Sequence, residues 1–516
     1  MTYKTVAASE SNVLPYRPAR PDRRYVTAAL MLVMVLASLE QTITSTAMPT
    51  MIGELHGFEH YSWVVSIYLL ALTVSMPLYG RLSDVLGRKR VILGAIVIFS
   101  VGSAMAAFAH TMNQLILYRG VQGLGAGGIM PVVLTILGDI FTLEERATIQ
   151  GLFSAIWGIA SLAGPALGAF LVTTLGWRSI FFVNLPPGIL GLIVLIWKYH
   201  DREKPHSTDL DLPGVATLSI ACTGALLLAS GVGPVGHGWG WTLGLLVVSL
   251  ISLVAFLRIE RIAPNAIMPP ALMMRRAIGP AMLGSFLLGA GFLCLDTYVP
   301  LYVQGGRGGG VGAAASVVTP VMLTWALSGI IAAPLVVNWG FRNTALLGSG
   351  LIIVGFTGLL LCAFTEAPRW VLTGVLALTG CGFGPASMAY LLAAQNAVGW
   401  QQRGIMTSGI QFFRTIGGAI GTGLMGMLFN VLIAPQVERL RAAGVDPATL
   451  LDTSGRHPLP TGILASVQHM ISGGLLWVFV AITVFACLQI LATTLMVRGR
   501  ASHGLSRAEA IEAIAA

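Results

Sequence analysis

Long apolar stretches alternate with short polar connections along almost the whole chain. The first runs without a charge from Tyr25 to Leu39, as YVTAALMLVMVLASL. A helix needs about 20 apolar residues to cross a bilayer, and most of the stretches approach that length. The pattern therefore predicts fourteen membrane-spanning helices, near residues 25–48, 62–80, 91–109, 114–137, 149–172, 180–197, 211–231, 241–257, 278–303, 312–337, 344–364, 371–396, 405–432 and 471–497.

Composition supports this interpretation. Of the 516 residues, 55% are hydrophobic and 10% are charged, whereas charged residues make up about a quarter of an ordinary globular domain. We therefore expect an all-α polytopic membrane protein. The cysteines lie inside the apolar stretches without paired or metal-like spacing, and we expect all of them to be buried free thiols: Cys222, Cys294, Cys362, Cys381 and Cys487.

The net charge of +9 is distributed in a way that argues against a nucleic-acid partner. With the N-terminus in the cytoplasm, 22 of the 30 Lys and Arg residues lie on the inner side and 6 on the outer side, while Arg119 and Arg414 lie within spans. This is the positive-inside bias. It predicts a plasma (cell inner) membrane protein with both termini in the cytoplasm.

Two hydrophilic connections, at 198–210 and 258–276, divide the spans into six, two and six. Two six-span halves suggest an internal duplication, which is the usual plan of secondary transporters. The expected organisation is a cytoplasmic leader (1–24), an N-terminal six-helix bundle (25–197), two extra helices with their linkers (198–276), a C-terminal six-helix bundle (277–497) with an extracytoplasmic loop (433–469), and a cytoplasmic tail (498–516).

The most specific motif is GRLSDVLGRKR, residues 80–90, between the second and third spans. Gly80 and Gly87 permit close backbone approach and turning. Asp84 can cap a helix or face a basic partner, and Arg88 with its basic neighbours holds the loop at the inner surface. The spacing resembles the signature loop of the major facilitator superfamily. The equivalent joint of the second half, VNWGFRN (337–343), resembles this motif only weakly.

Further motifs resemble the fourteen-helix drug:H+ antiporter branch of that superfamily: LEQTITSTAMP (39–49), LILYRGVQGLGAGG (115–128), GLFSAIWGIASLAGPALGA (151–169), GWRSIFFVNLPPG (176–188) and QFFRTIGGAIG (411–421). The resemblance implies two six-helix bundles around a cavity that opens alternately to each side, with two extra central helices. It also implies export of amphipathic, often cationic drugs in exchange for protons. Gly164, Pro165 and Gly168 match the antiporter motif and would let helices pack closely and bend. Asp139 is assigned with Asp84 to the gate.

Glu40 and Arg119 are charged groups at membrane depth. A carboxylate there costs at least about 2.5–3.5 kcal/mol and is a functional hypothesis by default. Helical rise places Glu40 about 12 Å, and Arg119 about 7–8 Å, from the outer ends of their spans, so the two side chains can approach one another. We expect them to take part in proton coupling. A purely structural ion pair is the alternative.

Asp296 is a second candidate for proton coupling, although its position near the outer end of a span is equally consistent with a solvated carboxylate. Arg414 lies near mid-membrane, with Gln411 on the same face. A role in the cavity or in clamping helices is favoured for Arg414, because a fixed cation would repel cationic drugs. Gln411, Arg414, Trp157 and Phe292 are weak candidates for substrate contact, and for the aromatic residues packing or lipid contact is the ordinary alternative.

The function favoured by the sequence is proton-coupled export of amphipathic, cationic drugs or dyes by alternating access. A dedicated exporter of one natural product or lipid fits the same motifs, and a non-transporting receptor or scaffold fits them less well. An enzyme is disfavoured, because the sequence shows no P-loop, no Ser/His/Asp set and no metal-ligand cluster, and no cofactor or metal is expected. Without a P-loop, the energy must come from an ion gradient.

Overall fold

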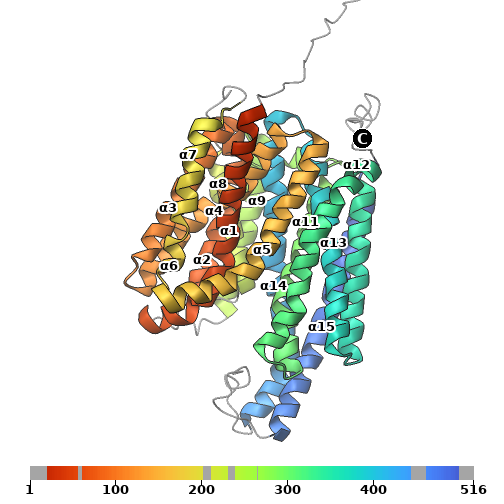
Figure 1. The fold of residues 1–516 in the computed structure, drawn as a ribbon. Helices are drawn as coiled ribbons and strands as arrows, with labels where there is room; N and C mark the ends of the chain where they lie inside the picture. The colour runs from red at the N-terminus through yellow and green to blue at the C-terminus, as the bar shows by residue number, and fades with distance from the viewer. Residues whose placement is uncertain are drawn as a thin grey trace, which may run out of the picture.

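The computed structural model describes residues 20–55, 61–201, 211–230, 239–263, 265–442 and 461–498. Every regular element in these ranges is a helix (Figure 1). Within them, 10 helices are long and apolar enough to cross a membrane. An all-helical membrane fold is therefore observed, while the number of fourteen spans stays a prediction.

The first half consists of α1 (Arg20–Leu55), α2 (Tyr61–Leu86), α3 (Arg88–Ala107), α4 (Met112–Ile140), α5 (Leu143–Leu175), α6 (Ser179–Phe182) and α7 (Leu185–Lys198). Helix α4 packs against both α2 and α3, and α1 packs against α5 and α7. The expected span at 180–197 is formed by α6 and α7 together, since Val183 and Asn184 between them keep helical torsion angles. Asn184 lies inside the bundle, where it is buried.

Two helices, α8 (Leu212–Ser230) and α9 (Trp239–Ile262), follow the first half and pack on each other. Helix α8 also contacts α2 and α14, so it touches both halves. After α9 the chain turns on a buried glutamate: the backbone nitrogens of Ile267 and Met268 donate to the carboxylate of Glu260, at 3.1 and 3.0 Å. A short helix, α10 (Pro270–Met273), leads into the second half.

The second half contains α11 (Gly279–Leu301), continued by a π-helical turn η2 (Tyr302–Gly306), then α12 (Val311–Phe364), α13 (Arg369–Asn396), a 3-10 turn η3 (Trp400–Gln402), α14 (Arg403–Ala442) and α15 (Thr461–Thr494). Helix α12 is two helices joined at a kink, where Gly340 has φ 81° and ψ 169°. Gly87, between α2 and α3, has φ 92° and ψ 150°. The same backbone conformation thus breaks the chain at the equivalent joint of each half.

The segment 433–469, expected as an extracytoplasmic loop, is helical at both of its ends. Helix α14 continues to Ala442 and α15 begins at Thr461, and Figure 1 shows the two helices projecting beyond the other helices at that end of the molecule. Most residues of 433–442 favour a helix, so the chain stays helical after its apolar stretch ends. Residues 443–460 lie outside the described residues, as do the leader up to residue 19, most of the 198–210 linker and the tail from residue 499.

The expectation that all cysteines are buried is also wrong. Cys222, Cys294 and Cys362 are buried, but Cys381 is partly exposed and Cys487 is exposed. An apolar stretch in a membrane protein has one face against other helices and another toward lipid, so hydrophobic neighbours in the sequence do not guarantee burial within the protein.

Candidate functional site

Asp84, near the end of α2, joins the two halves. Its Oδ1 accepts a hydrogen bond from the backbone nitrogen of Gly404 at 3.2 Å, and its Oδ2 accepts one from Ile405 at 3.0 Å. Gly404 and Ile405 belong to the first turn of α14, whose N–H groups have no partner within the helix. A carboxylate at a helix N-terminus is also favoured by the helix dipole. A side chain of the first half therefore caps a helix of the second half.

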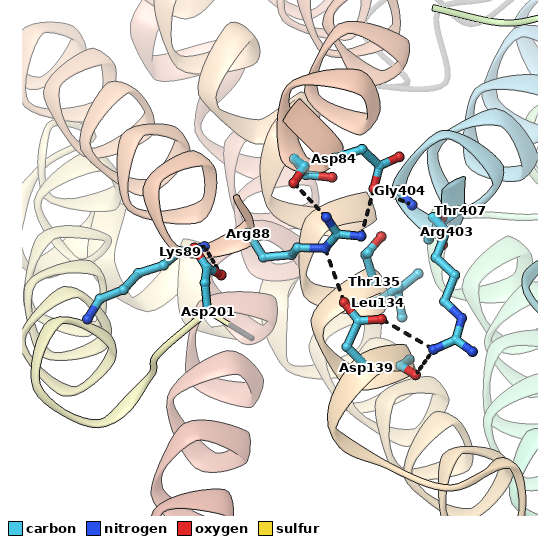
Figure 2. Close-up of polar contacts among 12 residues, drawn as sticks. Asp84, Arg88, Lys89, Leu134, Thr135, Asp139, Asp201, Arg403, Gly404 and Thr407 are labelled. Carbon is cyan, nitrogen blue, oxygen red and sulfur yellow. Dashed lines mark hydrogen bonds and ion pairs between the residues drawn. The ribbon is translucent and has the colours of Figure 1, made fainter. Parts of the chain in front are cut away.

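The charged network continues from Asp84 through three more side chains (Figure 2). Arg88 pairs with Asp84 at 2.7 Å and with Asp139, at the end of α4, at 3.1 Å. The other carboxylate oxygen of Asp139 lies 3.3 Å from Nη1 of Arg403, at the start of α14. The side chains of Asp84 and Arg88 are only 2% and 1% exposed. Because water is excluded, these charges attract one another more strongly than surface ion pairs do.

Glycine allows the two halves to meet closely at this point. A Cβ on Gly80 of α2 would lie 1.8 Å from Oγ of Ser408 on α14. The neighbouring Gly87, with its positive φ, turns the chain into α3, where Asp201 accepts from the backbone nitrogen of Lys89 at 3.0 Å. The glycines that the sequence assigned to the gate thus serve two purposes: Gly80 permits contact between halves, and Gly87 permits the turn.

Contacts between the halves continue along two further pairs of helices. Nε2 of Gln395 on α13 donates to the carbonyl of Leu134 on α4 at 3.4 Å. Helix α5 packs against α12, and Cβ atoms on Gly151 and Gly158 would collide with Ile330 and Ala326. The protein is therefore closed at the end where the sequence predicts the cytoplasm.

Glu40 on α1 lies in a separate, fully buried polar cluster inside the first half. Its carboxylate forms an ion pair with Arg119 on α4, accepts a hydrogen bond from Nδ2 of Asn184, and accepts another from Oγ1 of Thr44 at 2.8 Å. Glu40 is 1% exposed and Arg119 is 2% exposed. The approach of these two charges, expected from helical rise, is observed. In this conformation three donors satisfy the carboxylate.

Arg119 is fixed by further contacts that sequence reasoning missed. Its guanidinium lies 4.2 Å from the ring centroid of Tyr68, and Nη1 donates to Oε1 of Gln122 at 2.7 Å. Asn184 was also missed, although an asparagine within the apolar run FFVNLPP is a signal of its own. The Nδ2 atom of Asn184 also donates to Oγ of Ser103 on α3 at 3.0 Å, which holds the amide beside Glu40.

Asp296 on α11 and Arg414 on α14 differ from Glu40. Both side chains are partly exposed. Among the described residues, neither makes a hydrogen bond or an ion pair, and no charged group offsets either of them. The structure does not bring Asp296 to the Glu40–Arg119 cluster, which lies in the other half.

The remaining candidate residues belong to neither the gate network nor the Glu40 cluster. Phe292 packs edge-to-face on Trp325, with ring centroids 4.6 Å apart, and Gln411 is buried. Gly164 and Gly168 are buried on α5. The side chains of Trp157 and Pro165 lie outside the described residues.

An ion pair at the opposite end of the first half fixes α1 to the turn before α6. Arg178 pairs with Glu54, near the end of α1, and Nε1 of Trp177 donates to the same carboxylate at 2.7 Å. The hydrogen bond from Arg178, followed by that from Trp177, holds the pKa of Glu54 below its ordinary value. Nη2 of Arg178 also donates to the carbonyl of Ala109 at 3.2 Å, so this pair stabilises one half rather than joining two.

The comparison with protein families decides the identity of the fold. The model of the Major Facilitator Superfamily matches residues 30–422. The chain belongs to the major facilitator superfamily. It is accordingly a multi-pass membrane transporter rather than an enzyme, and the network around Asp84 lies within the matched region.

Relatives and solved structures agree with this assignment. The chain is 33% identical over 410 residues to the multidrug transporter protein MdtP of Bacillus subtilis (strain 168), covering 79% of this chain and 75% of that protein. It is 29% identical over 496 residues to multidrug resistance protein 3 of the same organism, covering 93% and 95%. Among solved structures, the human organic anion transporter MFSD10 has a TM-score of 0.60 at 15% identity, covering 90% of this chain and 100% of that one. A double tryptophan mutant of XylE has a TM-score of 0.61 at 14% identity, covering 95% and 98%. The structural likenesses, at this identity, show the fold alone.

Proposed function

We propose that the protein is a proton-coupled antiporter that exports amphipathic, cationic drugs or dyes from the cytoplasm across the plasma membrane. The names of the relatives support drug export, since MdtP is a multidrug transporter. The structural observation that best supports alternating access is the hydrogen-bonded cap that Asp84 forms on the N-terminus of α14. It joins the halves at one end only, through groups that can separate without breaking either half.

The gate works as a set of charged contacts that form in one state and are lost in the other. With the halves closed, Asp84 caps α14, and Asp139 lies between Arg88 and Arg403. When the halves separate at this end, water replaces the partners across the interface, while the Asp84–Arg88 pair stays within the first half. The cost of separation is moderate because the exposed groups are solvated, and a moderate cost is what a reversible gate requires.

Proton coupling is assigned to Glu40, Arg119 and Asp296. Glu40 is held by Arg119, Asn184 and Thr44, and we propose that these contacts change during the transport cycle. Asp296 has no partner among the described residues and is partly exposed, so it can exchange a proton without rearrangement. We propose that Asp296 meets protons and substrate in the central cavity expected between the halves, and that the Glu40–Arg119 pair changes with the position of α1 and α4.

The test uses purified protein in liposomes with an imposed pH gradient and a fluorescent lipophilic cation. We expect dye movement to follow the pH gradient and to stop when a protonophore collapses it, while a sodium gradient alone has no effect. Empty liposomes, and liposomes containing the Asp84→Asn variant, serve as controls. Dye movement that ignores the pH gradient would refute proton coupling. A protein that moves one natural product or lipid and no dye would favour the dedicated exporter.

A further inference from the structure

Arg414 is a cation that nothing in the proposed gate or proton path uses. It lies eleven residues into α14, about 16 Å from Arg403 by helical rise, so it is near the middle of the membrane. Among the described residues no acidic side chain offsets its charge and no group accepts from its guanidinium. Charged side chains at this depth are costly, and they are usually paired with one another or with backbone carbonyls. An unpaired one therefore indicates that the partner arrives from outside the protein.

Arg414 lies at the level of the last described hydrogen bond between α2 and α14. The contacts between α2 and α14 begin at Asp84 and Ile405 and reach Met76 and Thr415, whose Sδ and Oγ1 atoms are 4.0 Å apart. Among the described hydrogen bonds, this contact is the farthest from the gate that joins α2 to α14. Arg414 directly precedes Thr415, so it lies at the level where these described contacts end.

The backbone beneath Arg414 is fixed by α11. A Cβ on Gly289 would lie 1.9 Å from the carbonyl oxygen of Arg414, so the two helices touch at this level and leave no space for the side chain between them. This contact sets the register of the two helices. Since both run in the same direction, later residues of α11 lie farther from the gate than Arg414 does.

The next turns of α11 carry an aromatic side chain and then an acid. Phe292 follows Gly289 by three residues, is partly exposed, and packs at 4.6 Å on Trp325, which is also partly exposed. Asp296 follows Gly289 by seven residues, so it lies about 10 Å farther along the axis on nearly the same face. An aromatic surface therefore separates the level of the cation from the level of the acid.

We propose that Arg414 binds the acidic group of an amphipathic, zwitterionic substrate, whose aromatic body lies on Phe292 and Trp325 and whose amine lies toward Asp296. This proposal rests on the export function proposed above and narrows its substrate class, because a carboxylate is required beside the amine. The guanidinium suits this role, since it donates to both oxygens of a carboxylate at once and stays charged.

Binding to the purified protein in detergent tests the proposal without relying on transport. The probes are a fluorescent quinolone that carries a carboxylate and a piperazine amine, and the methyl ester of the same compound. We expect the unmodified protein to bind the acid about tenfold more tightly than the ester, which is the change produced by one charge-assisted hydrogen bond. Equal binding of acid and ester by the unmodified protein would overturn the proposal without any variant.

Variants then locate the preference. Arg414→Gln should bind the ester as before and lose the preference for the acid, and Arg414→Lys should keep part of it. Arg369→Gln, which changes an exposed arginine at the start of α13, should keep all of it. If Arg414→Gln weakens acid and ester equally, Arg414 is structural and the proposal is wrong.

Transport measurements distinguish a failure of the Arg414 subsite from a failure of the proposed proton-coupled export. Acid-selective binding through Arg414 in a protein that ignores the pH gradient would leave the subsite standing and refute proton coupling. Conversely, a protein that exports the lipophilic cation with the pH gradient but binds acid and ester alike would keep the antiport function and refute the subsite.

Discussion

Asp84 and Ile405 face each other across the interface between the halves, with 3.0 Å between the carboxylate oxygen and the backbone nitrogen. Asp201 makes the matching contact within one half, since it accepts from the backbone nitrogen of Lys89 at the start of α3. Two aspartates thus cap two helices, and only the first cap is broken when the halves separate.

We predict that Asp84→Asn impairs transport several-fold and leaves expression near normal. Asparagine can still accept a hydrogen bond, but the charge that faces Arg88 and the α14 dipole is lost, at a cost of about 1.5–3 kcal/mol. The measurement is dye efflux at matched expression, together with the labelling rate of a cysteine introduced at Ser408. Asp201→Asn is the control and should label like the unmodified protein. Unchanged transport in Asp84→Asn would show that the cap has no role in the cycle.

Gly80→Ala should hold the gate open. The added methyl group would meet Oγ of Ser408 at 1.8 Å and the carbonyl of Gly404 at 2.8 Å, and such overpacking costs about 1–3 kcal/mol. The closed state alone bears this cost, so its population should fall by about tenfold for every 1.4 kcal/mol. Distances between spin labels on α2 and α14 would report the change. Gly94→Ala, where a Cβ meets nothing within 4 Å, should leave the distances unchanged.

Glu40→Gln should abolish efflux driven by a pH gradient while part of the substrate binding remains. Glutamine keeps the volume and can accept from Asn184 and Thr44, but it does not titrate and leaves Arg119 without its counter-charge. Glu40→Asp should retain part of the activity. Asp296→Asn is the decisive companion: if Glu40→Gln transports at the normal rate with the normal pH dependence and Asp296→Asn does not, coupling belongs to Asp296 alone.

The pair of Glu54 and Arg178 should stabilise the protein down to mildly acidic pH. The pKa of Glu54 is lowered by the hydrogen bond from Arg178, so its contribution is present above the ordinary glutamate pKa of about 4.3 and is lost as the pH falls through the lowered value. The melting temperature of Glu54→Gln should therefore lie slightly below that of the unmodified protein from pH 8 to about pH 5, and the gap should close only in stronger acid. The gap is small because the pair is largely exposed. Glu366→Gln, at an exposed glutamate, should show no gap at any pH.

Orientation is predicted from the charge distribution alone. A single cysteine introduced at Asp452 should react with an impermeant thiol reagent in intact cells, and one introduced in the tail at Ser506 should react only after permeabilisation. Both are placed in a background without native cysteines, because Cys487 is exposed. The reverse labelling pattern would invert the topology.

Much of the site could be predicted, because the charge of a side chain and its depth in the membrane limit the partners that it can have. Asp84 was expected to cap a helix or face a basic partner, and it does both. Glu40 and Arg119 were paired by depth, since helical rise converts sequence position into distance along the membrane normal. The helical fold followed from apolar stretches near the length of a span.

The rest depended on which helices are neighbours, and the sequence does not give this. Asp84 caps α14, more than 300 residues away in the chain, and no local pattern identifies that partner. Asn184 reaches Glu40 because its side chain faces the inside of the bundle, and a single polar residue in an apolar run does not show which way it faces. The exposure of Cys487 depends on which face of α15 meets lipid, and hydrophobicity is the same on both faces.

Gly87 and Gly340 adopt nearly the same torsion angles at corresponding joints, with φ of 92° and 81°, although GRLSDVLGRKR and VNWGFRN share little else. The two halves therefore share the positive-φ turn at this joint, although they do not share the charged residues around it. An alignment of the two halves by backbone torsion angles would find their relationship at this joint, where an alignment by residue identity fails. The same reasoning makes glycine the residue required at position 340, because torsion angles of φ 81° and ψ 169° are essentially confined to glycine, whatever the charge of the loop around it.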